Sequence, residues 1–169
     1  MAPAPLGHFA LVLHTHLPFV LGHGRWPHGS DWLAEVTVGC YLPLLRTFAR
    51  LAERGCAPHA TVNITPVLAE QLAAPAFRRE IETFLRTRIA HARENAAEFA
   101  QQGRADLEEG ARRWESYYRR RLEQFERLDG DLIGAFRRLE DAGHLRLITC
   151  AATHGYLPLL LREESVDLQ

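Results

Sequence analysis

The pattern of apolar and polar positions in the first 65 residues predicts a strand, a long helix and a second strand. Residues 9–16 are apolar on both faces, which is typical of a parallel strand covered by helices. Between about residues 31 and 54, apolar side chains recur at helical intervals until Gly55, and Pro43 should kink or split this helix. Residues 60–65 form the second expected strand. This order with short connections predicts a right-handed parallel unit.

A long charged stretch separates the second strand from a third. Residues 75–143 have a helical pattern, and Gly103 and Gly110 are the places where we expect one long helix to give way to another. An apolar stripe recurs within this stretch: Phe125, Leu128, Leu132, Phe136 and Leu139. We expect the arms of a helical hairpin to bury Phe125, Leu132 and Phe136 against each other, with the charges on a solvated face. Residues 144–150 form the third strand.

Composition narrows the class of protein. At 169 residues, with 47% hydrophobic and 24% charged residues, the chain fits one globular domain over residues 1–169. The formal net charge of −1 gives no reason to expect a nucleic-acid or anionic-membrane partner. Three cysteines without Cys-x-x-Cys spacing argue against a disulfide framework or a thiolate zinc site. The N-terminus lacks a basic region and its apolar run is short, so we expect a cytoplasmic protein.

Histidines gather where the strands end. His14 and His16 are two residues apart on a strand, so their side chains point to the same side. His154 lies just beyond the third strand. Because α/β enzymes build their sites at the carboxyl ends of parallel strands, we expect the three imidazoles to meet at one rim. Isolated histidines elsewhere are more simply ordinary hydrogen-bonded core or surface residues: His59, His91 and His144.

Two further side chains are candidates for the same rim. The end of the second strand provides Asn63 and Thr65, and the next segment carries Glu70, which either contacts a substrate or only favours the helix dipole. Trp26 lies in the loop after the first strand. An indole in a loop can stack on the apolar C–H face of a sugar ring, and ordinary loop packing is the equal alternative.

Five segments resemble glycoside hydrolase family 57, in particular its α-1,4-glucan branching enzymes. They occur in the family's order: FALVLHTHLPF (9–19), GRWP (24–27), YLPLLR (41–46), ITPVLAEQL (64–72) and LITCAATHGYLPLL (147–160). The resemblance implies the N-terminal part of a (β/α)7 barrel, with about three parallel strands and a helical insertion at residues 75–143. It also implies that His14, His16, Trp26 and His154 line the donor-sugar subsite, and Glu70 joins them as a substrate-binding candidate.

The chain departs from the family pattern in two places. Gly39 and Cys40 precede Tyr41 where branching-type relatives are expected to have an acidic residue. The nucleophilic Glu of the family belongs to a later Trp-Leu-Pro-Glu segment and the general-acid Asp lies later still, and residues 1–169 contain neither segment. A retaining glycosidase needs two carboxylates about 5 Å apart. We therefore expect no catalytic residue within these 169 positions and no activity from them alone.

Three functions remain open from the sequence. The first is a retaining transglycosylase, without cofactor, that cuts an α-1,4-glucan and rejoins the piece through an α-1,6 bond. The second is a metal-dependent polysaccharide deacetylase, because His-x-His plus a distant His is also a zinc-ligand spacing; we expect no metal here. The third is a non-catalytic module that pairs through the helical hairpin. We also expect self-association through an open barrel edge, with Leu11, Leu13 and Ile148 on the exposed inner face.

Overall fold

A parallel sheet forms the spine of the protein. The computed structural model describes residues 7–169, in which the strands are β1 (Val12–Thr15), β2 (Ala60–Ile64) and β3 (Leu145–Ile148), ordered β1-β2-β3. Both pairings are parallel, and Leu13, Val62 and Leu147 share one row of the register. The predicted parallel unit is thus confirmed, with each strand shorter than its apolar run.

Pro43 splits the helical segment that connects β1 to β2, as the sequence predicts. The segment consists of α1 (Ser30–Val36), the π-helical turn η1 (Thr37–Tyr41) and α2 (Leu42–Glu53). A proline ring clashes with the preceding turn of an α-helix, and a π-turn relieves this crowding. The Leu42 N–H donates to the Thr37 carbonyl instead of the Val38 carbonyl. The Val38 carbonyl accepts a hydrogen bond from the Tyr117 hydroxyl instead, at 2.9 Å.

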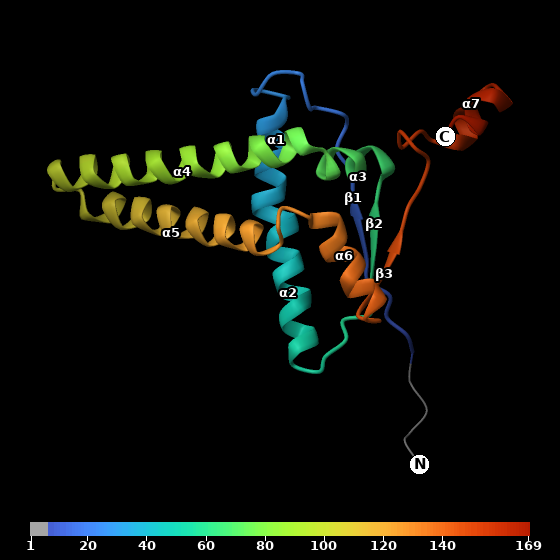
Figure 1. The fold of residues 1–169 in the computed structure, drawn as a ribbon, viewed down its shortest axis with the longest axis horizontal. Helices are drawn as coiled ribbons and strands as arrows, with labels where there is room; N and C mark the ends of the chain where they lie inside the picture. The colour runs from blue at the N-terminus through green and yellow to red at the C-terminus, as the bar shows by residue number, and fades with distance from the viewer. Residues whose placement is uncertain (1–6) are drawn as a thin grey trace, which may run out of the picture.

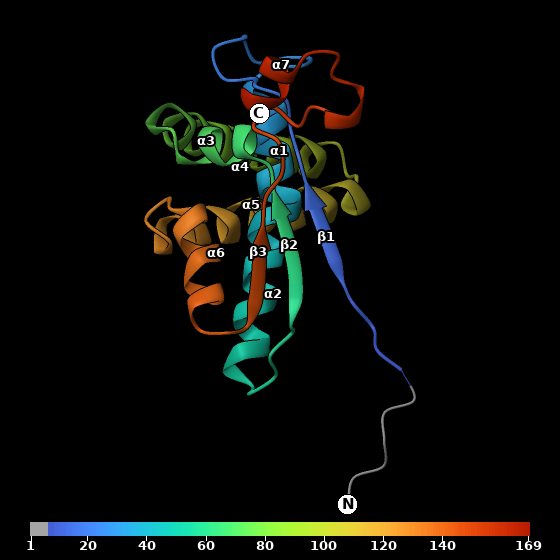
Figure 2. The same ribbon diagram turned by 90° about the vertical axis from the view of Figure 1, so that its right-hand side faces the viewer.

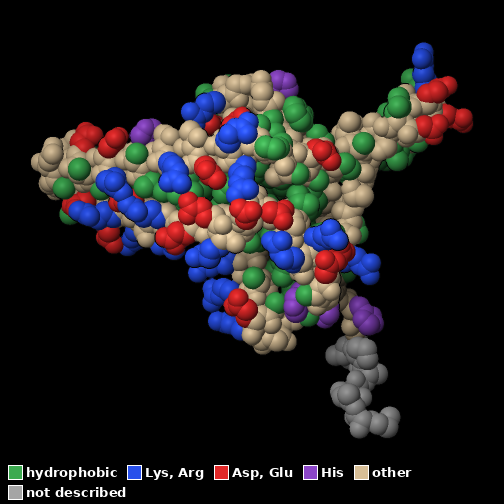
Figure 3. Space-filling view, in the orientation of Figure 1, with side chains coloured by type: hydrophobic (Ala, Val, Ile, Leu, Met, Phe, Trp, Pro, Cys, Tyr) green, Lys and Arg blue, Asp and Glu red, His purple; other side chains and the backbone are tan. Residues whose placement is uncertain are grey.

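The connection from β2 to β3 consists of four helices: α3 (Pro66–Ala73), α4 (Pro75–Gln101), α5 (Ala105–Arg127) and α6 (Leu132–Asp141). Of these, α4 and α5 form an extended helical hairpin. α4 and α5 run side by side away from the body of the protein (Figure 1), and acidic and basic side chains alternate over their surface (Figure 3). The turn between them falls at Gly103, as expected, where φ is +68°. The expectation for Gly110 was wrong: this residue lies inside α5, because a single glycine weakens a helix only by about 1 kcal/mol.

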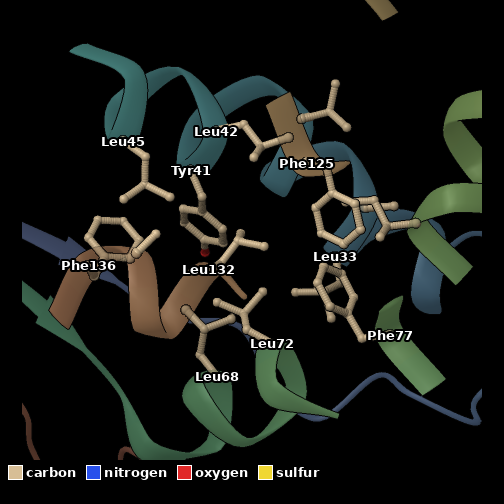
Figure 4. Packing of buried hydrophobic residues seen from close by; sticks show 14 of the residues in the cluster. Leu33, Tyr41, Leu42, Leu45, Leu68, Leu72, Phe77, Phe125, Leu132 and Phe136 are labelled. Carbon is tan, nitrogen blue, oxygen red and sulfur yellow. The ribbon is translucent and has the colours of Figure 1, made fainter. Parts of the chain in front are cut away.

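The hairpin arms bury Phe125 between them, but they do not bury Leu132 and Phe136 against each other. The chain breaks at Asp129 and Gly130, both with positive φ, and Asp131 caps α6 by accepting a hydrogen bond from the Gly134 N–H at 2.7 Å. Leu132 and Phe136 therefore belong to a separate helix. They pack into the main core beside α2 and α3 (Figure 4), so the predicted partner for these side chains was wrong. Phe125 contacts Phe77 of α4 edge to face at the base of the hairpin.

The sheet has one covered face and one bare face. Figure 2 shows the three strands with the helices α1 to α6 behind them. Leu13, Val62 and Leu147 point to the helices, whereas Val12 (57% exposed) and Ile148 (43% exposed) lie on the other face. Within residues 7–169, helices therefore cover β1 on one face only. The placement of Leu13 on the open face was wrong, since its side chain packs against the core.

The segment after β3 forms an arm at the carboxyl ends of the strands. It contains the short helices η2 (Leu157–Leu159) and α7 (Glu163–Asp167), and Figure 3 shows it standing apart from the body. Leu161 is fully exposed on this arm and Leu168 is 81% exposed. None of the helices within residues 7–169 is long and apolar enough to cross a membrane.

Candidate functional site

Three imidazoles meet at the carboxyl ends of the strands. The ring centroid of His154 lies 4.8 Å from that of His14 and 4.4 Å from that of His16, and the rings of His14 and His16 are 6.5 Å apart. The sequence predicts this convergence, and the structure shows it. We call these three residues the histidine rim. Because it lies where β1 and β3 end, it borders the bare face of the sheet.

The end of β2 fixes the orientation of two of these rings. The amide oxygen of Asn63 lies 2.7 Å from Nδ1 of His14, and the Asn63 amide nitrogen points to the Ile148 carbonyl. Since that amide oxygen can only accept, Nδ1 of His14 carries the proton and its Nε2 is left as an acceptor in the neutral ring. Nδ1 of His16 lies 3.1 Å from the hydroxyl of Thr65. Asn63 and Thr65 are buried, so they orient the imidazoles without being presented to a ligand.

His154 is held in an uncommon backbone conformation. Its φ is +62°, a region that few residues other than glycine adopt. The His154 N–H donates to the Ala151 carbonyl at 2.9 Å, and Oε1 of Gln169 accepts from both the N–H and the hydroxyl of Thr153 at 3.0 Å. The thiol of Cys150 lies 3.3 Å from Nδ1 of His154. The turn is therefore fixed from both sides. Neither Gln169 nor Cys150 is predicted from the sequence as part of this turn, because a distant amide and a solitary thiol form no pattern.

The surroundings of His16 favour its uncharged form. Burial lowers the pKa of His16 below its ordinary value, and positive charge on His154 or on His14 would lower it further. Protonation of His16 beside a protonated His154 or His14 would place two positive charges next to each other. Neutral imidazoles both donate and accept hydrogen bonds, which is the capacity needed to bind hydroxyl groups.

Gln71 anchors the loop that follows β1. Its side chain is completely buried; Oε1 accepts from the Val20 N–H at 2.7 Å and Nε2 donates to the Pro18 carbonyl at 3.0 Å. The loop is thereby tied to α3. The sequence pattern indicated the neighbouring Glu70 and not Gln71, since nothing in the sequence distinguishes a buried amide from an exposed one.

Two predicted site residues are not in contact with the histidine rim. Trp26 is 77% exposed in the loop between β1 and α1, and Glu70 is exposed on α3. Among residues 7–169, neither side chain forms a hydrogen bond, ion pair or ring contact with the three imidazoles. The structure therefore leaves their roles as predictions.

The geometry does not supply a metal centre. Within residues 7–169, no three side chains of His, Cys, Asp or Glu are grouped so that they could hold a metal ion. The three rings lie close to one another, with two pairs stacked, whereas metal ligands point their nitrogen lone pairs at one position. The chemistry that this site offers is hydrogen bonding by imidazoles whose orientations are fixed by Asn63, Thr65 and Cys150.

Comparisons with known proteins identify the relatives of this chain. The model of the glycosyl hydrolase family 57 matches residues 10–169. The chain is 38% identical over 163 residues to the 1,4-alpha-glucan branching enzyme TK1436 of Thermococcus kodakarensis, covering 96% of this chain. The structure is similar to the GH57-type branching enzyme of Pyrococcus horikoshii, with a TM-score of 0.87 and 39% identity over 94% of this chain. It is also similar to the alpha-amylase AmyC of Thermotoga maritima, with a TM-score of 0.78 and 26% identity over 89% of this chain.

The matched regions are a small part of these relatives. The chain covers 23% of the length of the Thermococcus enzyme, 29% of the Pyrococcus structure and 28% of the Thermotoga structure. Branching enzymes and an alpha-amylase thus share the arrangement of strands and helices described above.

Proposed function

Since the chain belongs to glycosyl hydrolase family 57, we propose that residues 1–169 form the N-terminal portion of the catalytic domain of a retaining 1,4-α-glucan branching enzyme. The observation that carries this proposal is the histidine rim, with three imidazoles beside a bare sheet face. In a (β/α)7 barrel, this bare face would be the inner wall. The rim would then face the sugar that is transferred.

In this proposal the histidine rim binds and orients the donor sugar. Nε2 of His14 accepts a hydrogen bond from a sugar hydroxyl, because its Nδ1 is committed to Asn63. His16 and His154 complete the set of hydroxyl partners, Trp26 stacks on a glucose unit and Glu70 accepts a further hydrogen bond. Holding the sugar in one orientation lowers the entropic part of the barrier, and contacts that strengthen in the transition state raise the rate.

The bond-breaking step needs groups that this rim does not have. Retention requires a nucleophilic carboxylate and an acid/base carboxylate about 5 Å apart. Among residues 7–169, the side chains that hydrogen-bond to the three imidazoles are an amide, a hydroxyl and a thiol. We therefore infer that residues 1–169 bind the substrate without cleaving it.

The cysteines of the chain fit a protein that works in a reducing cellular compartment. Cys40, Cys56 and Cys150 are all free thiols, which is the usual state of cysteine in the cytoplasm. A role in the synthesis of a glycogen-like α-glucan in the cytoplasm is consistent with these thiols.

Binding of maltotriose by calorimetry tests the proposal. His154→Asn removes a rim imidazole at a position with φ of +62°, and His59→Asn removes an imidazole at φ of +47°. Asparagine tolerates this backbone region, so the two variants are a matched pair. We expect His154→Asn to raise the Kd about tenfold, through the loss of hydrogen bonds to the sugar, and His59→Asn to leave the Kd unchanged. Equal effects of the two substitutions would contradict the proposed site.

A further inference from the structure

A shallow hollow lies on the helical hairpin, on elements other than those that carry the histidine rim. Its volume is 210 Å³. α4 contributes Arg88, His91 and Asn95 to its wall, and α5 contributes Trp114 and Tyr118. These residues belong to the charged stretch for which the sequence pattern predicts only a solvated face.

Two alanines create the hollow. Ala92 and Ala111 form its floor, where α4 and α5 approach each other, and they are 7% and 8% exposed. A longer side chain at either position would fill the space between the aromatic wall on α5 and the polar wall on α4. The depression is therefore a consequence of the sequence at the contact between the two helices.

The aromatic wall is rigid and open to solvent. Trp114 stacks on Tyr118, with centroids 5.5 Å apart and an angle of 25° between the rings, and it meets Tyr117 edge to face. Tyr117 is tied to the body of the protein by its hydrogen bond to the Val38 carbonyl. Trp114 nonetheless remains 56% exposed. Trp114, Tyr117 and Tyr118 thus form a fixed aromatic cluster whose outermost ring is open to a ligand.

The charges around the hollow are paired. The guanidinium of Arg88 lies 3.2 Å from the carboxylate of Glu35 and 4.7 Å from the centre of the Phe84 ring. On the same hairpin, Arg93 of α4 is paired with Glu115 of α5 at 3.2 Å. Because these positive charges are compensated, the hollow does not favour an anion. Its remaining partners, the Asn95 amide and the His91 imidazole, are groups that bind hydroxyls.

We propose that the hollow formed by Trp114, Tyr118, His91 and Asn95 is a second α-glucan-binding site. One glucose unit stacks on Trp114 through its apolar C–H face, and its hydroxyls bond to His91 and Asn95. This inference rests on the proposed function, since it takes the substrate to be a long α-glucan. A polymer that binds the hollow raises the local concentration of its other segments at the histidine rim.

Affinity electrophoresis in gels that contain soluble glycogen tests the second site. We expect Trp114→Ala to raise the apparent Kd for glycogen about tenfold, the factor that corresponds to about 1.4 kcal/mol. Trp114→Phe should retain much of the affinity, because it keeps an aromatic face. Arg113→Ala is the matched control, since Arg113 is the exposed neighbour of Trp114 on α5 and does not line the hollow. Circular dichroism of each variant checks that the hairpin is folded.

The same gels separate this inference from the proposed function. If His154→Asn reduces the retardation and Trp114→Ala does not, the second site is wrong and the histidine rim stands. If Trp114→Ala reduces the retardation and His154→Asn does not, the hollow stands and the rim is wrong. A wild-type chain that glycogen does not retard contradicts both. If Trp114→Ala changes the oligomeric size of the protein but not its retardation by glycogen, the hollow is a contact between protein molecules, and its assignment as a glucan-binding site is wrong.

Discussion

The two faces of the sheet differ although the same strands supply both. Val62 points to the helices and is completely buried, whereas Ile148 in the neighbouring strand is 43% exposed on the other face. The helix-covered face forms a core with α2, α3 and α6, and the bare face ends in three imidazoles. Alternation along a strand thus places buried core side chains on one face and exposed side chains on the other. Substitutions on the two faces should therefore have different effects.

The largest expected effect is a loss of stability on the covered face. Phe136→Ala should lower the free energy of unfolding by about 3–5 kcal/mol, because Phe136 is only 1% exposed in the core. Ile148→Ala on the bare face should cost less than about 1 kcal/mol, since much of that side chain is already in water. Urea denaturation of both variants measures the difference. Similar losses would show that the bare face is also buried in solution.

After the loss of stability, the next largest change that we expect is in self-association through the bare face. Val12 and Ile148 expose apolar area beside the free edges of a three-stranded sheet, which favours pairing with a second copy. Light scattering at tens of micromolar should report dimers or larger species. Ile148→Lys should shift the protein toward monomer, and Leu161→Lys, at a fully exposed position on the arm, should not. A wild-type chain that is monodisperse and monomeric would contradict the expectation.

A smaller effect is a dependence of stability on pH that originates at the histidine rim. Burial lowers the pKa of His16, and positive charge on His154 and on His14 lowers it further, so the folded state binds fewer protons than the unfolded state. The unfolding free energy contributed by His16 is therefore complete above about pH 6.5 and falls as the pH drops toward the lowered pKa. Thermal melts between pH 7.5 and 5 should show a steeper loss for the wild type than for His16→Gln. An identical slope would remove His16 as the cause.

The smallest expected effect concerns metal. Protein prepared without a histidine tag should contain no stoichiometric zinc, because the rim lacks a grouping of ligands that could hold it. Elemental analysis measures this directly. About one zinc per chain that is lost in His14→Ala would instead favour the deacetylase hypothesis.

Features that follow from a regular spacing of side chains were predicted from the sequence. Features that depend on a single contact between distant residues were not. The strands, the split at Pro43 and the meeting of His14, His16 and His154 all followed from spacing and from the topology of parallel strands. The predicted packing partner of Phe136 was wrong, because a helical period shows which side chains share a face but not which element covers that face. Gln71 was missed for a related reason: an amide becomes an anchor only when the fold brings the carbonyl of Pro18 within its reach.

Nuclear magnetic resonance of the wild-type chain with maltoheptaose tests sugar binding at the histidine rim, because one sample reports both binding and cleavage. We expect the imidazole signals of His14, His16 and His154 to shift on addition of the sugar, while that of His59 does not. We also expect the anomeric signals of the sugar to stay unchanged after prolonged incubation, since the rim lacks a pair of carboxylates. Rim signals that do not move would contradict binding at this site. New anomeric signals that are absent with Glu70→Gln would show that these 169 residues carry out the chemistry themselves.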